Sequence, residues 1–400
     1  MTEVVIVSAA RTALTKSFRG SFNDTEAPVL GGAVVQAVVE RAGIDGAGVD
    51  DVIMGAAVQQ GTQGYNIGRL CAYTAGLPDS VPGMALDRMC ASGLMSIAVG
   101  ANNILAGDMD TVVAGGVESL SLTQTKHKNS YRARSEAVIA AAPDAYIQMI
   151  ETAEIVAQRY GISREAQDRY ALQSQQRTAS AQRAGLFDDE IIPLTVNQLL
   201  FDEQKQPAGH NTVTARHDEC NRPDTSYESL AALKPVWRDG KHIAQGEHIT
   251  AGNASQFSDG AAATLLMSAS RAAALGVAPL GKYKGVAVAG CAPEEMGIGP
   301  MFAIPKLLKR FGLTVDDIGL WEINEAFASQ VIYCADKLEI PYDRLNVNGG
   351  AISIGHPFGM SGTRMVAHGL LEAKRRGVRY LVVAMCIGGG MGAAGLFEVQ

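Results

Sequence analysis

The 400-residue sequence lacks the features of metal-binding, disulfide-rich, membrane-spanning and nucleic-acid-binding proteins. Its six cysteines are scattered, without a Cys-x-x-Cys pair or a histidine cluster, so we expect free thiols, a reducing compartment and no metal. No apolar run approaches about 18 residues, which predicts no membrane span. The N-terminal stretch MTEVVIVSAARTA is typical of a strand rather than a targeting peptide, which favours a cytoplasmic location. The net charge of -7, with Lys and Arg spread along the chain, argues against nucleic acid as a partner.

The sequence does contain an internal repeat. The run SGLMSIAVGANNILAGDMDTVVAGG from Ser92 has an apolar helical period, a glycine stop and a β-rich end, and SGTRMVAHGLLEAKRRGVRYLVVAM from Ser361 has the same layout. A second pair, RAGIDGAGVDDVIMGAAV from Arg41 and RFGLTVDDIGLWEINEAFA from Arg310, places Val-Asp-Asp before an apolar strand in both copies. Because 400 residues exceed what one core usually supports, we expect two similar α/β halves.

The domain organisation follows from where the repeat is interrupted. The short, continuous apolar strands predict a mostly parallel sheet covered on both faces. An insertion of polar helices, one of them capped by Ser163 and stopped at Gly185, breaks the pattern. Such insertions often build binding sites. We therefore predict a first half of residues 1–118 plus 250–273, an insertion of residues 119–249 laid over it that builds the binding site, and a second half of residues 274–400.

Two residues at predicted turns carry reactive groups. Cys90 in DRMCASG lies where a buried helix begins, and the helix dipole there would lower the pKa of its thiol and favour a nucleophilic thiolate. A small core residue is the alternative. His356 in NVNGGAISIGHPFGMSG stands between Gly355 and Pro357, outside any periodic element, so we interpret its ring as aimed at a ligand.

Two further candidates follow predicted strands. Cys386 precedes the glycine-rich IGGGMG, where another molecule can approach the backbone closely. The repeat places Cys386, Cys90 and His356 at one central seam, and open α/β sheets bind ligands where strands end. Asn324 in WEINEAFASQ could donate to a carbonyl oxygen with Glu325 orienting it, or it could cap the helix that follows.

The motifs around these residues, CASG at Cys90, NEAFA at Asn324, NGGAISIGHPFGMSG at His356 and CIGGGMG at Cys386, resemble the successive signatures of the thiolases along essentially the whole chain. The resemblance implies a five-layered αβαβα fold. It also implies that Cys90 takes the acyl group as a thioester, that His356 activates this thiol, and that Cys386 is the acid and base for the acetyl-CoA carbanion. Asn324, through a water, and His356 would form one oxyanion hole, and the N–H groups of Cys90 and Gly388 the other.

The resemblance further implies coenzyme A as co-substrate, without a permanently bound cofactor. The matching positions are Ser255 at the pantetheine, Arg222 and Ser229 near the nucleotide, and Met149 and Phe327 along the acyl channel. Arg222 could equally be a solvated loop cation. The implied partners are 3-ketoacyl-CoA, acetyl-CoA and coenzyme A, and the implied assembly is a homodimer or homotetramer that could join a β-oxidation multifunctional partner.

Degradative and biosynthetic thiolases share this chemistry, so the substrate must be inferred from the sequence positions at which the two groups differ. Biosynthetic acetoacetyl-CoA thiolases carry a histidine before the loop-domain methionine, whereas this chain has Gln148 before Met149. The stretches NRPDTSYESLAALKP, SQFSDGAAA and AGCAPEEMGIGP resemble the β-oxidation enzymes. We therefore predict an acetyl-CoA C-acyltransferase (3-ketoacyl-CoA thiolase) of fatty acid β-oxidation and lipid metabolism, with an acetoacetyl-CoA thiolase as the alternative. The acyl chain length and type stay open.

Two other classes of protein remain as alternatives. A ketoacyl synthase-type condensing enzyme shares the fold and the cysteine, but the NEAF motif and Cys386 argue against it. A non-catalytic acyl-CoA-binding protein would not need all four reactive residues. The basic segment TQTKHKNSYRAR (residues 123–134) could guide coenzyme A phosphates, contact another subunit or be a solvated loop. Activity is expected to fall at low pH as His356 becomes cationic.

Overall fold

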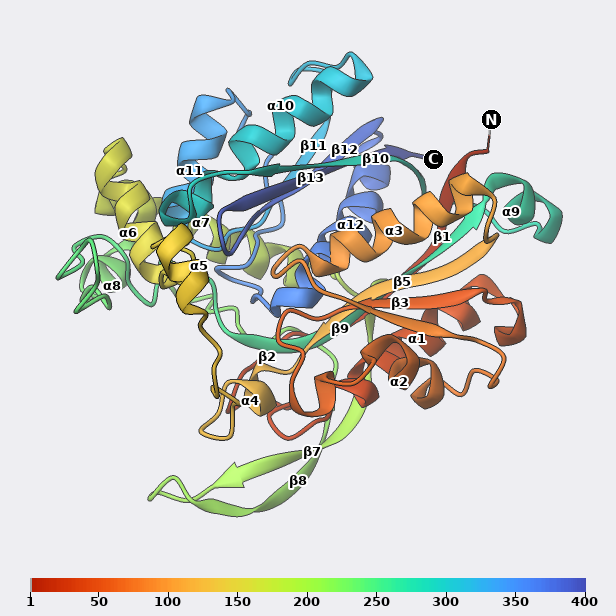
Figure 1. Cartoon of the computed structure of the whole chain (residues 1–400), viewed down its shortest axis with the longest axis horizontal. Coiled ribbons are helices and arrows are strands. Elements are labelled where there is room, and N and C mark those ends of the chain that lie inside the picture. Colours follow the sequence, from red (N-terminus) through yellow and green to blue (C-terminus); the bar gives the residue numbers. More distant parts are fainter. Residues whose placement is uncertain (1) are drawn as a thin grey trace.

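The chain is organised around two half-sheets that join edge to edge (Figure 1). The computed structural model describes residues 2–400. The first half contains β1 (Val4–Thr12), α1 (Ala27–Ala42), β3 (Asp51–Gly55), α2 (Ile67–Thr74), β4 (Gly83–Leu86), α3 (Ser92–Ala106), β5 (Thr111–Glu118) and β9 (Ser258–Ser268). The second half contains β10 (Gly281–Gly290), α10 (Pro300–Phe311), β11 (Leu320–Ile323), α11 (Ala328–Lys337), α12 (Phe358–Arg376), β12 (Tyr380–Ile387) and β13 (Met391–Val399).

The order of the strands confirms the internal repeat. The first half-sheet runs β1-β9-β5-β3, with β4 beyond it, and the second runs β10-β13-β12-β11. The two are joined through β1 and β10, whose antiparallel register includes the pair Val4 and Tyr283. The helices α3 and α12 hold equivalent places, and both end at a glycine in the left-handed region, Gly107 (φ 87°) and Gly377 (φ 64°). These are the glycine stops that the sequence predicts.

The prediction of a mostly parallel sheet is wrong. Within the first half, β3 pairs in parallel with β4 and β5, but β9 runs antiparallel to both β1 and β5. Within the second half only β11 and β12 are parallel, since β13 runs antiparallel to β12 and β10. Helices cover both faces of each half-sheet, and β1, β5 and β9 are buried along their whole length although they pair in different directions. Continuous apolar strands therefore report this double burial and not the direction of pairing.

Alternating burial along the strands defines five layers, as the resemblance implies. In β1, Val5 and Val7 pack against α1 and α2 in an outer core, whereas Val4 and Ile6 face a middle core that contains α3 and α12. In β11, Leu320 faces the same middle core and Trp321 faces a second outer core with α10 and α11. The layers are thus α1 and α2, the first half-sheet, α3 and α12, the second half-sheet, and α10 and α11.

The helix α3 departs from the expectation that no apolar run approaches the length of a membrane span. The 18 residues Met89–Ala106 have a mean hydropathy of 1.4, and among residues 2–400 this is the one helical stretch that is long and apolar enough. The structure gives this composition a different cause, because α3 lies in the middle layer and packs against strands of the first half and against α12. The buried share of this stretch, 56%, faces that core, and its packing there accounts for the apolar composition.

The segment between β5 and β9 lies over one side of the half-sheets and contains most of the remaining elements. Its helix α7 begins after Ser163, whose Oγ accepts a hydrogen bond from the N–H of Ala166, and Gly185 follows its end with φ 69°, as predicted. The hairpin of β7 and β8 extends away from the layers (Figure 1). The segment contains α4 (Leu120–Thr123), α5 (Glu136–Ala141), α6 (Met149–Tyr160), α7 (Arg164–Arg183), β6 (Ile191–Ile192), β7 (Leu194–Phe201), β8 (Pro207–Ala215) and α8 (Tyr227–Ala231). The short elements β2 (Thr15–Lys16) and α9 (Ala269–Leu275) complete the fold, with short 3-10 helices at Gly46–Gly48, Gly61–Gln63 and Pro293–Ile298.

Candidate active site

A cavity of about 640 Å³ brings together three of the reactive side chains that the sequence singles out. Cys90, His356 and Cys386 all line it, although they are separated by up to 296 residues along the chain (386 minus 90). Its size is that of an ordinary small-molecule site. Apolar side chains form most of the rest of the wall, including Met149, Ile150, Val236, Met296, Phe257, Phe327 and Phe358.

Close packing of α3 against α12 places Cys90 and His356 together, because each residue lies just before one of these helices. A side-chain carbon at Gly93 would lie 2.7 Å from the carbonyl oxygen of Gly359, and one at Gly362 would lie 2.6 Å from the backbone nitrogen of Leu94. Only glycine permits this approach. The two N-terminal turns are therefore in contact, and the residues that precede them reach the same cavity.

The expected low pKa of Cys90 is wrong. Burial raises the pKa of the Cys90 thiol to about 12, although the backbone N–H groups of Gly388 and of Cys90 itself act in the opposite direction. Glu118 and Asp87 add a negative potential that also disfavours the thiolate. Cys90 precedes the first helical residue, Ser92, by two positions, and desolvation there outweighs the helix dipole. The thiol is neutral in this structure, and a base must remove its proton during reaction.

His356 is placed to be that base. Its Nδ1 lies 2.6 Å from Oγ of Ser361, and this hydroxyl also donates to the carbonyl oxygen of Pro357 at 2.9 Å. Because the hydroxyl has one proton, the pair of contacts assigns the ring proton to Nδ1 and leaves a lone pair on Nε2. Burial, with a smaller effect of the Arg364 charge, lowers the pKa of His356 to about 3, so the imidazole is neutral. Phe358 packs edge-on against the ring at 5.1 Å between centroids.

Asn324 extends the site beyond the cavity wall. Its backbone N–H donates to the carbonyl oxygen of Ala384 at 2.9 Å, so it continues the parallel pairing of β11 with β12. Its Nδ2 lies 3.3 Å from Nε2 of His356. Its buried Oδ1 has no hydrogen-bond partner among residues 2–400 and is available to water or substrate. The capping alternative is wrong, because the residue before α11 is Phe327.

Glu325 does not orient the Asn324 side chain directly, as the sequence suggests it could. Its carboxylate instead accepts hydrogen bonds from Tyr170 (3.0 Å), Ser174 (2.7 Å) and the backbone N–H of Ile352 (3.1 Å). It thereby ties the turn after β11 to α7 and to the glycine-rich segment before His356. Glu325 therefore positions Asn324 only by anchoring the backbone of the turn that carries both residues.

Cys386 is the second-to-last residue of β12 and lines the cavity just before the glycine turn. Its side chain is 1% exposed, and burial followed by the neighbouring Cys90 thiol holds its pKa well above the usual value. The glycines that follow leave the space open, since a side-chain carbon at Gly388 would meet only Sδ of Met149, at 3.6 Å. A thiol that stays protonated and faces a cavity can donate a proton to a carbanion formed there.

The residues predicted to contact coenzyme A line two neighbouring hollows. Ser255, Met149 and Phe327 line the main cavity. Arg222 and Ser229 line a second hollow of about 360 Å³, which shares Ala251 and Gln256 with the first. Ser229 also closes a capping box with Ser226 at the start of α8. The two hollows are therefore neighbours, with Arg222 at one and the reactive thiols at the other.

Several lining residues are not among those predicted from the sequence. Gln124, Lys128, Gln148 and Phe358 contribute to the wall, and Ser361 holds the His356 ring from behind. Ser361 follows the histidine by five residues in HPFGMS, but only the first turn of α12 brings its hydroxyl to Nδ1. Gln124 and Lys128 belong to the basic segment 123–134, for which the sequence leaves open a role in guiding coenzyme A, a subunit contact or a solvated loop.

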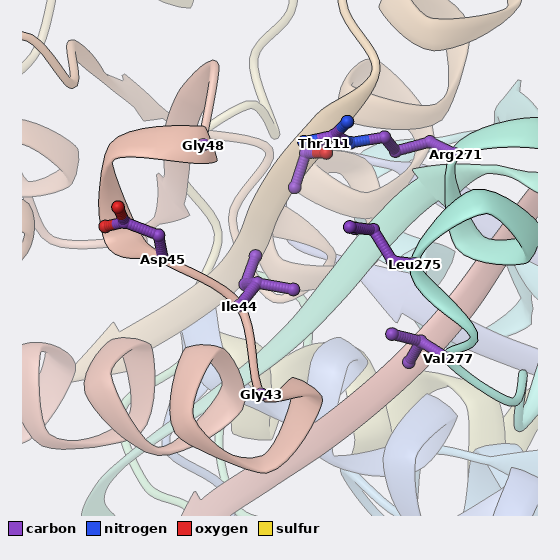
Figure 2. A pocket seen from close by; sticks show the side chains of 8 residues that line it. All are labelled: Gly43, Ile44, Asp45, Gly48, Thr111, Arg271, Leu275 and Val277. Carbon is purple, nitrogen blue, oxygen red and sulfur yellow. The ribbon is translucent and has the colours of Figure 1, made fainter.

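A smaller hollow of about 210 Å³ contains none of the predicted site residues (Figure 2). Ile44, Leu275 and Val277 point into it, and Thr111 at the start of β5 forms part of its rim. The other end of β5, Glu118, accepts a hydrogen bond from the N–H of Gly359 beside the site. The two ends of this strand are about 23 Å apart, so the hollow is remote from the reactive groups. Among residues 2–400, no group of three or more His, Cys, Asp or Glu side chains is placed to hold a metal ion.

A thiol, a neutral imidazole and a second thiol that face one largely apolar cavity, with a side-chain amide at the imidazole, define a class of protein, the cysteine-dependent acyl-transfer enzymes. Residues 4–270 match the family described as "Thiolase, N-terminal domain", and residues 277–399 match "Thiolase, C-terminal domain". The chain belongs to the thiolase family. The resemblance drawn from the sequence motifs and the fold that it implies are confirmed.

Individual relatives agree with this assignment. The chain is 45% identical to a 3-ketoacyl-CoA thiolase of Bacillus subtilis over the full length of both proteins. It is 44% identical to the peroxisomal 3-ketoacyl-CoA thiolase B of Rattus norvegicus, covering 99% of this chain and 91% of that protein. Among solved structures, the Bacillus anthracis acetyl-CoA acetyltransferase superposes with a TM-score of 0.87 and 36% identity, over 100% of this chain and 99% of that one.

Proposed function

We propose that the protein is an acetyl-CoA C-acyltransferase that cleaves 3-ketoacyl-CoA with coenzyme A to acetyl-CoA and a shortened acyl-CoA. The observation that carries this proposal is the convergence of Cys90, Cys386 and His356 on one cavity. Breaking a carbon–carbon bond next to a ketone requires a nucleophile, a base to activate it, and a proton source for the carbanion that leaves. These three side chains supply the three groups, and the names of the full-length relatives support the same reaction.

In the first half-reaction, Nε2 of His356 takes the thiol proton of Cys90 while the sulfur attacks the ketone carbon. The N–H groups of Cys90 and Gly388, which already point at the sulfur, hold the oxygen that becomes negative. The bond between C2 and C3 then breaks, and its electron pair passes to C2 of the departing acetyl-CoA. Asn324, through a water, and His356 stabilise the enolate oxygen, and Cys386 gives its proton to C2.

In the second half-reaction, the Cys386 thiolate takes the proton of the incoming coenzyme A thiol. The resulting thiolate attacks the Cys90 thioester, the acyl group passes to coenzyme A, and Cys90 recovers its proton from His356. Each proton that leaves a side chain is therefore returned in the same cycle. No permanently bound cofactor is required by this scheme.

Coenzyme A is proposed to lie along the two neighbouring hollows, with its nucleotide near Arg222 and Ser229 and its pantetheine beside Ser255. Met149 and Phe327 would line the acyl channel. The guanidinium of Arg222 has no ion-pair partner among residues 2–400, which suits a phosphate ligand. The variant Arg222→Ala is expected to raise KM for coenzyme A about tenfold with little change in kcat. An unchanged KM would show that Arg222 is only a solvated cation.

An acetoacetyl-CoA thiolase is the second candidate, because the solved Bacillus anthracis structure bears the name acetyl-CoA acetyltransferase. Gln148 at the position where biosynthetic members carry histidine favours the degradative reaction. The test follows the Mg-enolate absorbance of 3-ketoacyl-CoA substrates of increasing chain length, with and without added coenzyme A. We expect cleavage of chains longer than acetoacetyl-CoA, and activity confined to acetoacetyl-CoA would favour the alternative.

The same measurement separates the other classes of protein. A ketoacyl synthase-type enzyme would not consume 3-ketoacyl-CoA in a reaction that depends on coenzyme A, and a non-catalytic acyl-CoA-binding protein would give no turnover. We further propose a cytoplasmic homodimer or homotetramer in which residues 119–249 act as a loop domain over the active site. Light scattering of the purified protein tests the assembly.

A further inference from the structure

Glu118 is a buried carboxylate that stands close to the start of both central helices. It is the last residue of β5, its side chain is fully buried, and none of the ion pairs within residues 2–400 includes it. A buried charge without a counter-ion is unfavourable unless other groups replace its hydration. The reaction scheme makes no use of this carboxylate, so its presence needs an explanation.

Four hydrogen-bond donors surround the carboxylate. Its Oε2 accepts hydrogen bonds from the backbone N–H groups of Ala57 at 2.9 Å and Gly359 at 2.7 Å. Its Oε1 accepts from the N–H of Val58 at 3.2 Å and from Nε2 of Gln63 at 2.6 Å. A proton on either oxygen would find no acceptor among these groups. They therefore hold Glu118 in its ionised form, although burial raises the pKa of the carboxyl group.

Two further contacts fix the orientation of the Gln63 amide. Its Oε1 accepts a hydrogen bond from the N–H of Ser119, and its Nε2 also donates to the carbonyl oxygen of Val58 at 2.8 Å. Turning the amide over would break both contacts. The group that meets Glu118 is therefore a donor, and this side chain offers no acceptor to a protonated carboxyl group.

The contact with Gly359 caps α12. Gly359 is the second residue of that helix, and the residue before the helix, Pro357, has no side-chain acceptor for its N–H groups. The first turn of α12 also carries Ser361, whose hydroxyl holds Nδ1 of His356. The carboxylate thus anchors the turn that aims the imidazole. A neutral Ser or Asn would cap a helix without burying a charge, so capping alone does not explain a carboxylate here.

The same carboxylate acts on the nucleophile. The loop after β3 supplies two of its donors, and the last residue of β3 is in contact with the start of α3. A side-chain carbon at Gly55 would lie 2.5 Å from the carbonyl carbon of Ser92. Two carboxylates raise the pKa of the Cys90 thiol, and the effect of Glu118 is larger than that of Asp87. The charge therefore disfavours a thiolate in the resting enzyme.

We propose that Glu118 is a positioning residue for acyl transfer, whose charge keeps the resting nucleophile protonated and whose hydrogen bonds set the start of α12 against the loop after β3. The inference rests on the proposed function, because it assigns Cys90 as nucleophile and His356 as base. Alkylating agents react with thiolates, so the same charge protects the resting sulfur from them. The proton leaves only when His356 takes it during attack on the substrate.

The first test measures alkylation of Cys90 in the full-length protein at about pH 8. Iodoacetamide reacts with the thiolate, and mass spectrometry of the Cys90 peptide separates this site from the other cysteines. Glu118→Gln removes the charge and should speed alkylation of Cys90 about tenfold. Glu118→Asp keeps the charge on a side chain one methylene shorter, so alkylation should proceed at the wild-type rate.

A second charge variant leaves Glu118 in place. Gln63→Lys sets a counter-ion beside the unchanged carboxylate, so it should also speed alkylation of Cys90 about tenfold. Glu151→Gln is the matched control, because Glu151 in α6 is another buried carboxylate that accepts backbone N–H groups, those of His242 and Ile243. The main shifts in the pKa of Cys90 come from other groups, so this control should keep the wild-type rate of alkylation.

The second test measures the positioning role by steady-state cleavage of 3-ketoacyl-CoA. Both Glu118 variants weaken the contact with Gly359 and let the turn that carries His356 shift. We therefore expect kcat to fall about tenfold or more in each variant, with little change in KM. Thermal unfolding of the variants verifies that the measured proteins are folded.

Three results would overturn the inference. An alkylation rate equal to that of the wild type in either charge variant, Glu118→Gln or Gln63→Lys, would show that the charge does not act on Cys90. Gln63→Lys decides this point even where no Glu118 variant folds. Equal acceleration in Glu118→Gln and Glu118→Asp would mean that the site has opened, and an unchanged kcat in both would remove the positioning role.

Failure of the proposed function gives a different result. A wild type that cleaves no 3-ketoacyl-CoA would overturn that function and the positioning role with it. Alkylation requires no substrate, so cleavage by the wild type together with unaltered alkylation in the charge variants would overturn this inference alone.

Discussion

At the scale of single residues, the site is a set of neutral groups. Burial raises the pKa of Cys90 to about 12 and lowers the pKa of His356 to about 3, so thiol and imidazole coexist without forming an ion pair. The charges appear only when substrate is attacked, next to N–H groups that are already oriented toward the sulfur. Preorganised donors of this kind stabilise a transition state without reorganisation.

The pH dependence follows from the direction of the His356 shift. A base whose pKa is lowered from 6.5 to about 3 stays neutral between about pH 5 and pH 8, so kcat/KM should show no acid limb from its protonation in that range. The low-pH fall expected from the sequence thus moves to much lower pH. Steady-state kinetics on protein verified to remain folded at each pH would check this. An acid limb with an apparent pKa near the ordinary value of 6.5 would contradict it.

The two cysteines should separate into different half-reactions. Cys90→Ser replaces the nucleophile with a much weaker one and should abolish both cleavage and condensation. Cys386→Ala removes only the proton donor, so acyl-CoA should still acylate Cys90 while carbon–carbon cleavage is lost. Mass spectrometry of the intact variants after incubation with acyl-CoA measures this, and an unacylated Cys90 in Cys386→Ala would disprove the division of labour.

At the scale of elements, the glycine motifs indicate how the helices pack, whereas the periodicity of apolar residues does not indicate how the strands pair. The pattern of Gly93, Gly359 and Gly362 around the reactive residues marks the crossing of α3 and α12, and the repeat identifies these helices as equivalents. Strand direction could not be obtained in this way, because β9 and β13 are as apolar as the parallel strands beside them. The raised pKa of Cys90 escapes a reading of the sequence for a similar reason. The sequence shows a helix start, whereas the desolvation that dominates depends on residues far away in the chain.

The crossing of the central helices offers a test at this scale. A side-chain carbon at Gly116 in β5 would overlap the carbonyl oxygen of Gly359 in α12, which is a backbone atom and cannot turn aside. Gly116→Ala should therefore destabilise the protein by about 1–3 kcal/mol and reduce kcat by displacing the turn that carries His356. Chemical denaturation and steady-state kinetics would measure the two effects.

The control for this substitution is Gly48→Ala. The nearest neighbour of a side-chain carbon there is Nη2 of Arg271 at 3.9 Å, so the change should alter stability by no more than about 0.5 kcal/mol. Equal stability of the two variants would mean that β5 and α12 can separate without cost. The positioning of His356 would then need another explanation.

At the scale of the whole molecule, a buried charge network joins the parts that the sequence separates. Glu190, between α7 and β6, pairs with Arg11 of β1 at 2.7 Å and with Nδ1 of His368 of α12 at 3.0 Å. Arg11 also pairs with Asp218 at 2.7 Å. The network thus connects the first half, the inserted segment and the second half at one point. No motif predicts it, because its members lie in different parts of the chain and none belongs to the thiolase signatures.

Removing the central carboxylate of this network tests how the halves are held together. Burial opposes ionisation of Glu190, but the charges of His368 and Arg11 outweigh it and lower the pKa to about 2. A depressed carboxyl pKa stabilises the fold above pH 4.5, and this contribution is lost as the pH falls toward 2. Glu190→Gln leaves a buried cation with one partner fewer and should cost about 3–5 kcal/mol at neutral pH.

The difference in stability between wild type and Glu190→Gln should shrink on acidification, because the wild type loses the same charge by protonation. Glu165→Gln, which breaks an exposed pair with Arg169, is the control and should leave the melting temperature unchanged. Thermal unfolding of the three proteins across this pH range measures both effects. If Glu190→Gln and the wild type have the same melting temperature at neutral pH, the network does not hold the two halves together. The packing of α3 against α12 alone must then align Cys90 with His356.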